Sequence, residues 1–376
     1  MRLLPPRKRR EQQGREDQPM DGRPQPKTDE ELQHEADKKK LIALLDEYKV
    51  DLITVAANCL VARDLKRSLE SIAGDLKNKI VTEDEENRAK KVGHSESTLR
   101  KEILTIWGST EVPKLFSMSH NSQRMHKNIQ QTHKQAISLA RFEQDPLCEL
   151  LNLWSSITAE NQALALNLDP MQKWVNQARL ADGLEEVNIQ VVNEIGIDIN
   201  LACEHEHMHS MLQFISGFGP RKAKRFISKM KCLGKKLTTR SEIIKSDLLG
   251  QEVYFSAIAF IKIRVPDEDL GSSGNNQFHI LDQTRIHHES YKLAMKIARD
   301  TGQGDNEVNE NDKGTQMLLL REIMANPAKL KSLDLQTYNN ELVRNNQQHL
   351  IKIIDKIIKE LSSPFGDPRE YRNHQK

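Results

Sequence analysis

Cysteines, aromatic residues and long apolar runs are all scarce in this chain of 376 residues. The four cysteines lie far apart without a C-x-x-C pair, which argues against a zinc knuckle and a disulfide framework. Aromatic residues make up only 5%, which disfavours a large β-sandwich and favours helices. No stretch of 18 apolar residues exists to span a membrane, and the basic N-terminus lacks the apolar core of a secretory signal.

An excess of charge of either sign is also missing. Lys and Arg total 56 and Asp and Glu total 54, so the formal net charge is +2. This balance excludes a uniformly basic, histone-like protein and requires any basic surface to be local. Residues 1–30 are rich in Pro, Arg, Gln and Asp, and we predict a disordered basic tail. Within it, PPRKRR (5–10) fits either a nuclear import signal or a solvated charge run.

The apolar pattern predicts a mainly α protein with a small α/β portion. Strands are expected at 50–57 and 113–119, with helices near 60–76 and 128–140, which is an α/β fragment with too few strands for a complete sheet. After Pro146 the pattern is helical almost to the end, apart from polar loops at 266–277 and 302–313.

The segment MLQFISGFGPRKAKRFISKM (211–230) carries the most specific signal. An apolar helix is expected to end at Ile215, the sequence Gly217-Phe218-Gly219 to form a tight turn, and Pro220 to begin a second helix. This is the helix–hairpin–helix pattern. Its glycines permit positive φ, and the backbone N–H groups at the start of the second helix can then bind an anion.

The charges around this turn indicate what the anion is. No Asp or Glu occurs from His207 to Ser241, while the same window holds nine cations. Unopposed cations beside a phosphate-binding turn are typical of a sequence-independent nucleic-acid site. The predicted contact residues are Gly217, Gly219, Arg221, Lys222, Lys224, Arg225 and Lys229. The alternative is that the glycines only make a helical corner and the lysines keep it in solution.

A second turn, Leu248-Leu249-Gly250-Gln251, lacks the second glycine, and we expect a structural partner hairpin. Its predicted buried residues are Val253, Phe255, Ile258, Phe260 and Ile261. Upstream, residues 205–209 match H-E-x-x-H, which on a helix would bind zinc. No third ligand is evident, so we expect ordinary histidines. Without a P-loop, G-x-S-x-G or Rossmann fingerprint, we predict no catalytic residue, no metal and no cofactor.

Several longer segments resemble one family. VNEIGIDIN (192–200), followed by LQFISGFGPRKA (212–223), is similar to the central region of the suppressor-of-Ty-six family of eukaryotic transcription elongation factors and histone chaperones. The bacterial Tex proteins are more distant relatives. Further similar segments are AISLARFEQDPL (136–147), ILDQTRIHHESYKLAMKIA (280–298), IMANPAKLKSLDL (323–335) and PREYR (368–372).

This resemblance implies a domain order. Residues 1–30 would be the tail, 31–150 a partial YqgF-like domain of the RNase-H fold, 151–265 a tandem helix–hairpin–helix domain, 266–362 a small helical death-like domain, and 363–376 a tail leading to an absent S1 domain. The family's acidic N-terminus, S1 domain and tandem SH2 domains are not present. We therefore expect either a fragment or a reduced paralogue.

The resemblance also implies a function. The chain would be a non-enzymatic nuclear factor that binds DNA or RNA, supports RNA polymerase II elongation and maintains nucleosomes. Its partners would be nucleic acid, the polymerase elongation complex and histones, with no membrane. The alternatives are a protein–protein scaffold with a purely structural hairpin and a vestigial nuclease.

Overall fold

The structure is a computed structural model that describes residues 29–90, 103–155, 160–264, 279–302, 313–332, 340, 342–344 and 348–363. Of the tail predicted at 1–30, residues 1–28 lie outside the described residues, and residues 29 and 30 begin α1. The interiors of the polar loops and the C-terminal tail beyond 363 also lie outside them. The chain divides into two compact units. Among the described residues, one contains 29–90, 103–118 and 128–146, and the other contains 119–127 and 147–363.

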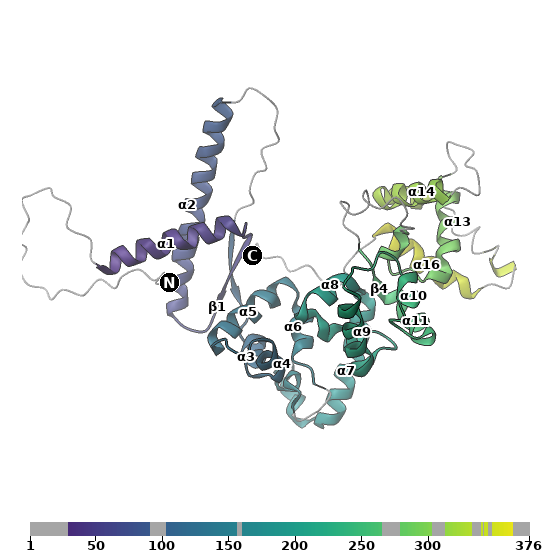
Figure 1. Cartoon of the computed structure of the whole chain (residues 1–376), viewed down its shortest axis with the longest axis horizontal. Coiled ribbons are helices and arrows are strands. Elements are labelled where there is room, and N and C mark those ends of the chain that lie inside the picture. Colours follow the sequence, from purple (N-terminus) through teal and green to yellow (C-terminus); the bar gives the residue numbers. More distant parts are fainter. Residues whose placement is uncertain are drawn as a thin grey trace, which may run out of the picture. The chain divides into compact units, whose positions relative to one another are not determined.

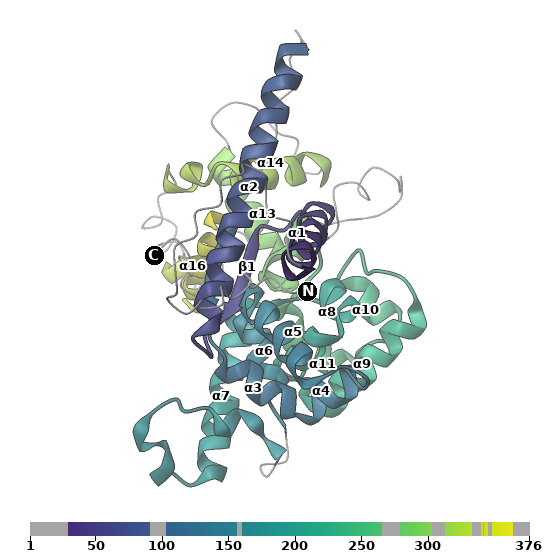
Figure 2. The same cartoon turned by 90° about the vertical axis from the view of Figure 1, so that its left-hand side faces the viewer.

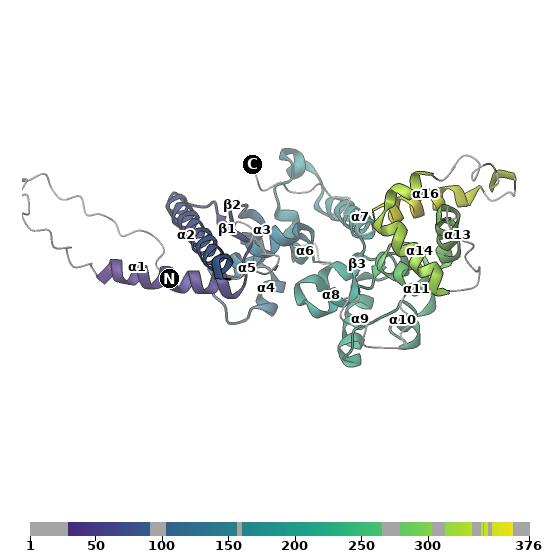
Figure 3. The ribbon, with the colours of Figure 1, turned by 90° about the horizontal axis from the view of Figure 1, so that it is seen from above.

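The first unit is a small α/β arrangement. Its elements are α1 (Asp29–Glu47), β1 (Leu52–Ala56), α2 (Val61–Lys90), β2 (Leu104–Gly108), α3 (Glu111–Met118) and α5 (Gln131–Gln144). The two strands are parallel, with Leu52 opposite Leu104 and Ala56 opposite Gly108 (Figure 3). The strand predicted at 50–57 is thus confirmed, and α2 provides the helical crossover that a parallel pair requires.

Residues 113–118 lie in a helix, so the strand predicted at 113–119 is wrong. Pro113 falls in the first turn of α3, where its missing N–H removes no helical hydrogen bond. Val112 and Phe116, four residues apart, are both buried, and α3 packs against α5. The apolar seam has the period of a helix. The second strand is instead β2, a segment for which the apolar pattern predicted no strand.

The second unit is helical. Its first part contains α4 (His120–Met125), α6 (Pro146–Asn152), the 3-10 helices η2 (Gln162–Ala165) and η3 (Pro170–Trp174), α7 (Gln177–Ile195), β3 (Ile197–Asp198), α8 (Ile199–Glu204), η4 (Glu206–Phe214), α9 (Gly219–Leu233), α10 (Ser241–Lys245), α11 (Gln251–Ala257), η5 (Ile258–Phe260) and β4 (Ile261–Lys262). Figure 1 shows these elements in teal and green. Apart from α4 and η3, these elements contribute to one continuous apolar core, from Leu147 to Ile263.

A short parallel pair closes this core. Ile197 lies opposite Ile261 and Asp198 opposite Lys262, so the segment after α7 pairs with the segment after η5. Ile197, Ile199 and Ile261 are all inaccessible to solvent or nearly so. The helical pattern expected after Pro146 is interrupted here, because α11 and η5 end and Ile261 and Lys262 form β4.

The rest of the second unit has its own core, from Ile280 to Leu361. Its elements are η6 (Ile280–Gln283), η7 (His288–Ser290), α13 (Tyr291–Gly302), α14 (Lys313–Ala325), η8 (Pro327–Ser332) and α16 (His349–Ser362). The Arg285 guanidinium donates to the buried Glu360 carboxylate, with Nη2–Oε2 at 2.6 Å, and fastens the η6–η7 loop to α16. The mainly α prediction is confirmed, while the YqgF-like and death-like assignments stay predictions.

Candidate nucleic-acid interface

The turn before α9 has the backbone conformation that its glycines predict. Gly217 has φ of +88° and Gly219 has φ of +68°, in the region that favours glycine. A Cβ at position 217 would lie 3.2 Å from Ser256 Cβ, whereas one at position 219 would meet no atom within 4 Å. Gly217 therefore permits the close approach of α11, and Gly219 leaves the backbone open on its outer side.

Phe218 fixes this turn in the core. Its side chain is buried, and its ring centroid lies 5.5 Å from that of Phe226, two turns into α9. Pro220 stands in the first turn of α9, and Ala223 is buried, as the hairpin pattern predicts.

The start of α9 offers backbone donors to an anion. Phe218 is the N-cap residue and has no oxygen in its side chain to satisfy the first turn. Gly219 and Arg221 carry first-turn amide groups, which have no carbonyl four residues earlier within the helix. Together with the dipole of this 15-residue helix, these amides favour a bound phosphate.

Four of the predicted contact residues form an exposed cationic face. Arg221, Lys222, Lys224 and Arg225 are all exposed, and none of them forms an ion pair within the described part of the chain. The opposite face of α9 buries Ala223, Phe226 and Met230. Lys222 Nζ donates to the Gly217 carbonyl at 2.8 Å, which holds its ammonium over the turn. We name these four residues the α9 cation face.

Acidic residues from outside the 207–241 window fold back onto it, so the prediction of nine unopposed cations is wrong. Lys229 Nζ lies 2.8 Å from Asp247 Oδ2, and this hydrogen bond holds the pKa of the Asp247 carboxyl below its ordinary value. Lys236 pairs with Glu204 at 3.1 Å and Lys235 with Glu242 at 3.7 Å. Lys229 is therefore near the site, but its charge is already compensated.

Arg240 is not a surface cation at all. It is 2% exposed, and its guanidinium donates to the carbonyls of Ile261, Thr284 and Ile286. Asp282 accepts the Arg240 backbone N–H, and Tyr291 links the two side chains. Nothing in the local sequence distinguishes this arginine from its exposed neighbours, because its partners lie 21 to 51 residues further along the chain.

The second hairpin forms at the predicted turn. Gly250 is the N-cap of α11 and has φ of −68°, so this turn needs no left-handed glycine. Ile258 and Ile261 are buried as predicted, and Val253 and Phe260 partly so. Phe255 is 40% exposed, so its predicted burial is wrong, and Tyr254 fills the core instead.

The H-E-x-x-H match does not form a zincin helix. The helix expected to end at Ile215 is broken, since α8 ends at Glu204 and the 3-10 helix η4 follows. Three residues per turn place positions four apart on different faces. His209 Nε2 lies 3.4 Å from the Cys203 carbonyl, and burial lowers the pKa of this imidazole. Within the described ranges, no group of three His, Cys, Asp or Glu residues is placed to hold a metal.

Family models match the helical part of the chain. A model described as a helix-hairpin-helix motif matches residues 161–264, and one described as an HHH domain matches residues 279–369. The second match covers residues for which the sequence resemblance implied a death-like domain. In the described part of the chain, no helix combines the length and apolar character needed to cross a membrane.

Relatives that match most of the chain belong to one family of proteins. The chain is 30% identical over 306 residues to the Suppressor of Ty 6 homolog of Caenorhabditis elegans, covering 81% of this chain and 18% of that protein. It is 30% identical over 344 residues to transcription elongation factor SPT6 of Drosophila melanogaster, covering 91% and 17%. The SPT6 of Saccharomyces cerevisiae is 30% identical over 277 residues, covering 71% and 18%. The chain thus spans less than a fifth of the length of these relatives.

Proposed function

The chain is a homologue of the central region of the suppressor-of-Ty-six proteins, and from this premise we propose that it is a non-enzymatic nuclear factor of transcription elongation. In this proposal it binds nucleic acid without sequence preference and supports RNA polymerase II elongation and nucleosome maintenance. Several relatives are named as transcription elongation factors, not as enzymes.

The α9 cation face carries the proposal. Two glycines with positive φ expose the start of α9, and four unpaired cations surround its backbone amides. Backbone amides and flexible cations bind phosphate rather than base edges, so the contact is independent of sequence. The proposed contact consists of Gly217, Gly219, Arg221, Lys222, Lys224 and Arg225. Lys229 lies nearby, but its ion pair with Asp247 reduces its contribution to phosphate binding.

Charge reversal at Arg221 and Lys222 tests the proposal. Arg221→Glu with Lys222→Glu should reduce affinity for a fluorescent DNA duplex at least tenfold near physiological salt. The slope of log affinity against log salt should become shallower by about 2, because two phosphate contacts are lost. Thermal stability should barely change, since both side chains are exposed.

A matched control separates contact from net charge. Lys352→Glu with Lys356→Glu makes the same charge change on exposed positions of α16. It should leave the salt slope unchanged. If both double variants lose affinity equally, or if neither does, the α9 cation face is not the contact. The scaffold alternative would then be favoured, and partners retained after nuclease treatment of a nuclear extract would support it.

A further inference from the structure

The segment that leads into α7 presents large apolar side chains to solvent. Trp174 is 77% exposed, Met171 66%, Leu168 60% and Val175 45%. Single exposed apolar residues are ordinary, but four within eight residues are characteristic of an interaction surface. Tryptophan is also the residue that most often dominates binding energy at protein interfaces.

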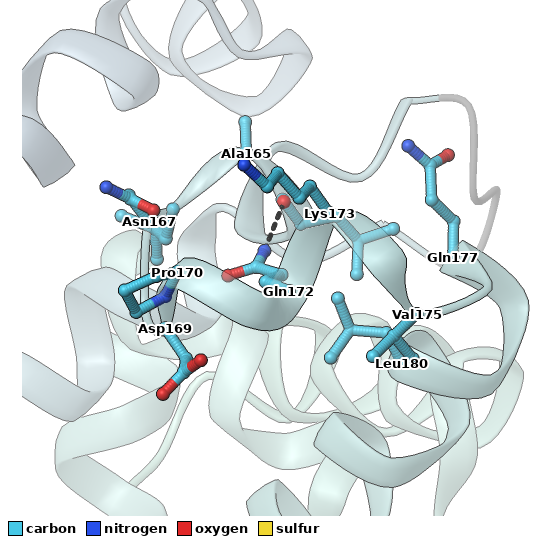
Figure 4. A pocket seen from close by; sticks show the side chains of 11 residues that line it. Ala165, Asn167, Asp169, Pro170, Gln172, Lys173, Val175, Gln177 and Leu180 are labelled. Carbon is cyan, nitrogen blue, oxygen red and sulfur yellow. Dashed lines mark hydrogen bonds between the residues drawn. The ribbon is translucent and has the colours of Figure 1, made fainter.

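Specific hydrogen bonds hold this segment in place. Gln172 Nε2 donates to the Leu164 carbonyl at 2.9 Å (Figure 4), while its Oε1 accepts the Leu168 N–H at 3.1 Å. Asp169 Oδ1 caps η3 by accepting the Met171 N–H at 2.7 Å. The apolar side chains therefore project from an ordered backbone, which lowers the entropy cost of binding a partner.

A pocket lies beside these side chains. Its volume is about 270 Å³, which is enough for one large apolar side chain. In Figure 4, Asn167 and Asp169 lie at one part of its lining, and Val175 and Leu180 at another. Leu164 and Leu166 add further apolar lining. A lining that combines apolar and polar side chains suits an anchoring side chain from a peptide.

The charge of the surrounding surface selects the partner. Residues 160–186 contain five acidic and two basic side chains, a balance of −3. All five carboxylates are exposed, and none forms an ion pair within the described ranges: Glu160, Asp169, Asp182, Glu185 and Glu186. Lys173, one of the two cations, has its Nζ 5.6 Å from the centre of the Trp174 ring. A net acidic surface disfavours a polyanion and favours a cationic partner.

We propose that residues 160–186 form a docking surface for a basic protein segment that carries at least one large apolar side chain. The apolar side chain enters the pocket beside Trp174, and Lys or Arg residues on either side of it face the exposed carboxylates. In Figure 2 the teal segment before α7 lies well apart from α9, so this surface is separate from the proposed nucleic-acid contact.

A panel of synthetic peptides tests this surface on the full chain. Each labelled 12-residue peptide carries one Leu, Phe or Trp flanked by Lys and Arg. Matched peptides replace either the apolar residue by Ser or the basic residues by Glu. At least one basic apolar peptide should bind, measured by fluorescence anisotropy, and both of its matched peptides should bind at least tenfold more weakly.

Variants of the chain locate the binding. Trp174→Ala should weaken the peptide at least tenfold, and Asp182→Lys with Glu186→Lys should also weaken it, while melting temperatures stay unchanged because these residues are exposed. Arg221→Glu with Lys222→Glu should leave peptide affinity unaltered. Failure of every basic peptide, equal affinity of the Ser-substituted peptides, or full affinity in Trp174→Ala would overturn the proposal. So would a loss of duplex affinity in Trp174→Ala, which would assign the surface to nucleic acid.

Discussion

Replacement of Arg240 by methionine tests whether the buried arginine holds the second unit together. The guanidinium is 2% exposed and donates to three backbone carbonyls and to Tyr291, while the Arg240 backbone N–H is held by Asp282. Methionine fills a similar volume but leaves those carbonyls without donors. A buried acceptor without a partner costs about 1–3 kcal/mol, and breaking a buried charged network about 3–5 kcal/mol. We therefore expect a loss of about 3–5 kcal/mol in the free energy of unfolding.

Urea unfolding provides the measurement. Far-UV circular dichroism reports the whole chain, and fluorescence reports its three tryptophans, of which Trp154 is buried edge-on against Phe214 in the first apolar core of the second unit. Arg225→Met, on the exposed side of α9, is the matched control and should cost no more than about 0.5 kcal/mol. If Arg240→Met lies within that range of the control, the hydrogen-bond network contributes nothing net and the reasoning is refuted.

Three further predictions follow from the site and its surroundings. Gly217→Ala should lower the melting temperature more than Gly219→Ala, because each strains a positive φ by about 1–2 kcal/mol but only the methyl at 217 meets α11; equal melting temperatures would contradict the geometry. Lys229→Gln should weaken duplex binding, measured by anisotropy, less than Lys224→Gln does, since Asp247 already compensates Lys229. Acidification from about pH 7.5 to about pH 5.5 should lower the free energy of unfolding. Burial holds the pKa of the His288 imidazole below 6.5, so the unfolded chain binds more protons than the folded chain in that window, and stability decreases as the pH decreases. His288→Phe should flatten this dependence in urea titrations, and an unchanged dependence would assign it to other groups.

Structural features that depend on a few neighbouring residues could be predicted from the sequence, and features that depend on distant parts of the chain could not. The hairpin turn was predictable because Gly217, Gly219 and Pro220 determine backbone conformation within a few residues, and the structure confirms that conformation. The strand predicted at 113–119 was wrong because a short apolar run fits either period, and packing against α5 selected the helix. Tyr254 and Phe255 are neighbouring aromatic residues, and only the tertiary position of α11 decides which one is buried.

The charge pattern shows the same limit at the site itself. A window without acidic residues predicts a basic face, but it says nothing of carboxylates that arrive from elsewhere in the chain. Lys229, Lys235 and Lys236 all meet such carboxylates, and Arg240 leaves the surface altogether. The hairpin pattern therefore located the site, while the number of available cations required the structure.

The number of available cations has a quantitative consequence for binding to nucleic acid. The whole chain carries a formal charge of only +2, so its attraction to a polyanion must come from cations gathered on one surface. The α9 cation face supplies four side chains without an ion pair, and the fifth such cation of the window, Lys231, lies in the last turn of α9, away from the hairpin turn. Each phosphate contact on duplex DNA contributes about −0.9 to the slope of log affinity against log salt, so this face alone gives a slope of about −3.6. The nine cations of the uninterrupted window would give about −8 instead, so the measured slope distinguishes a site limited by folded-back carboxylates from one that uses every cation in the window.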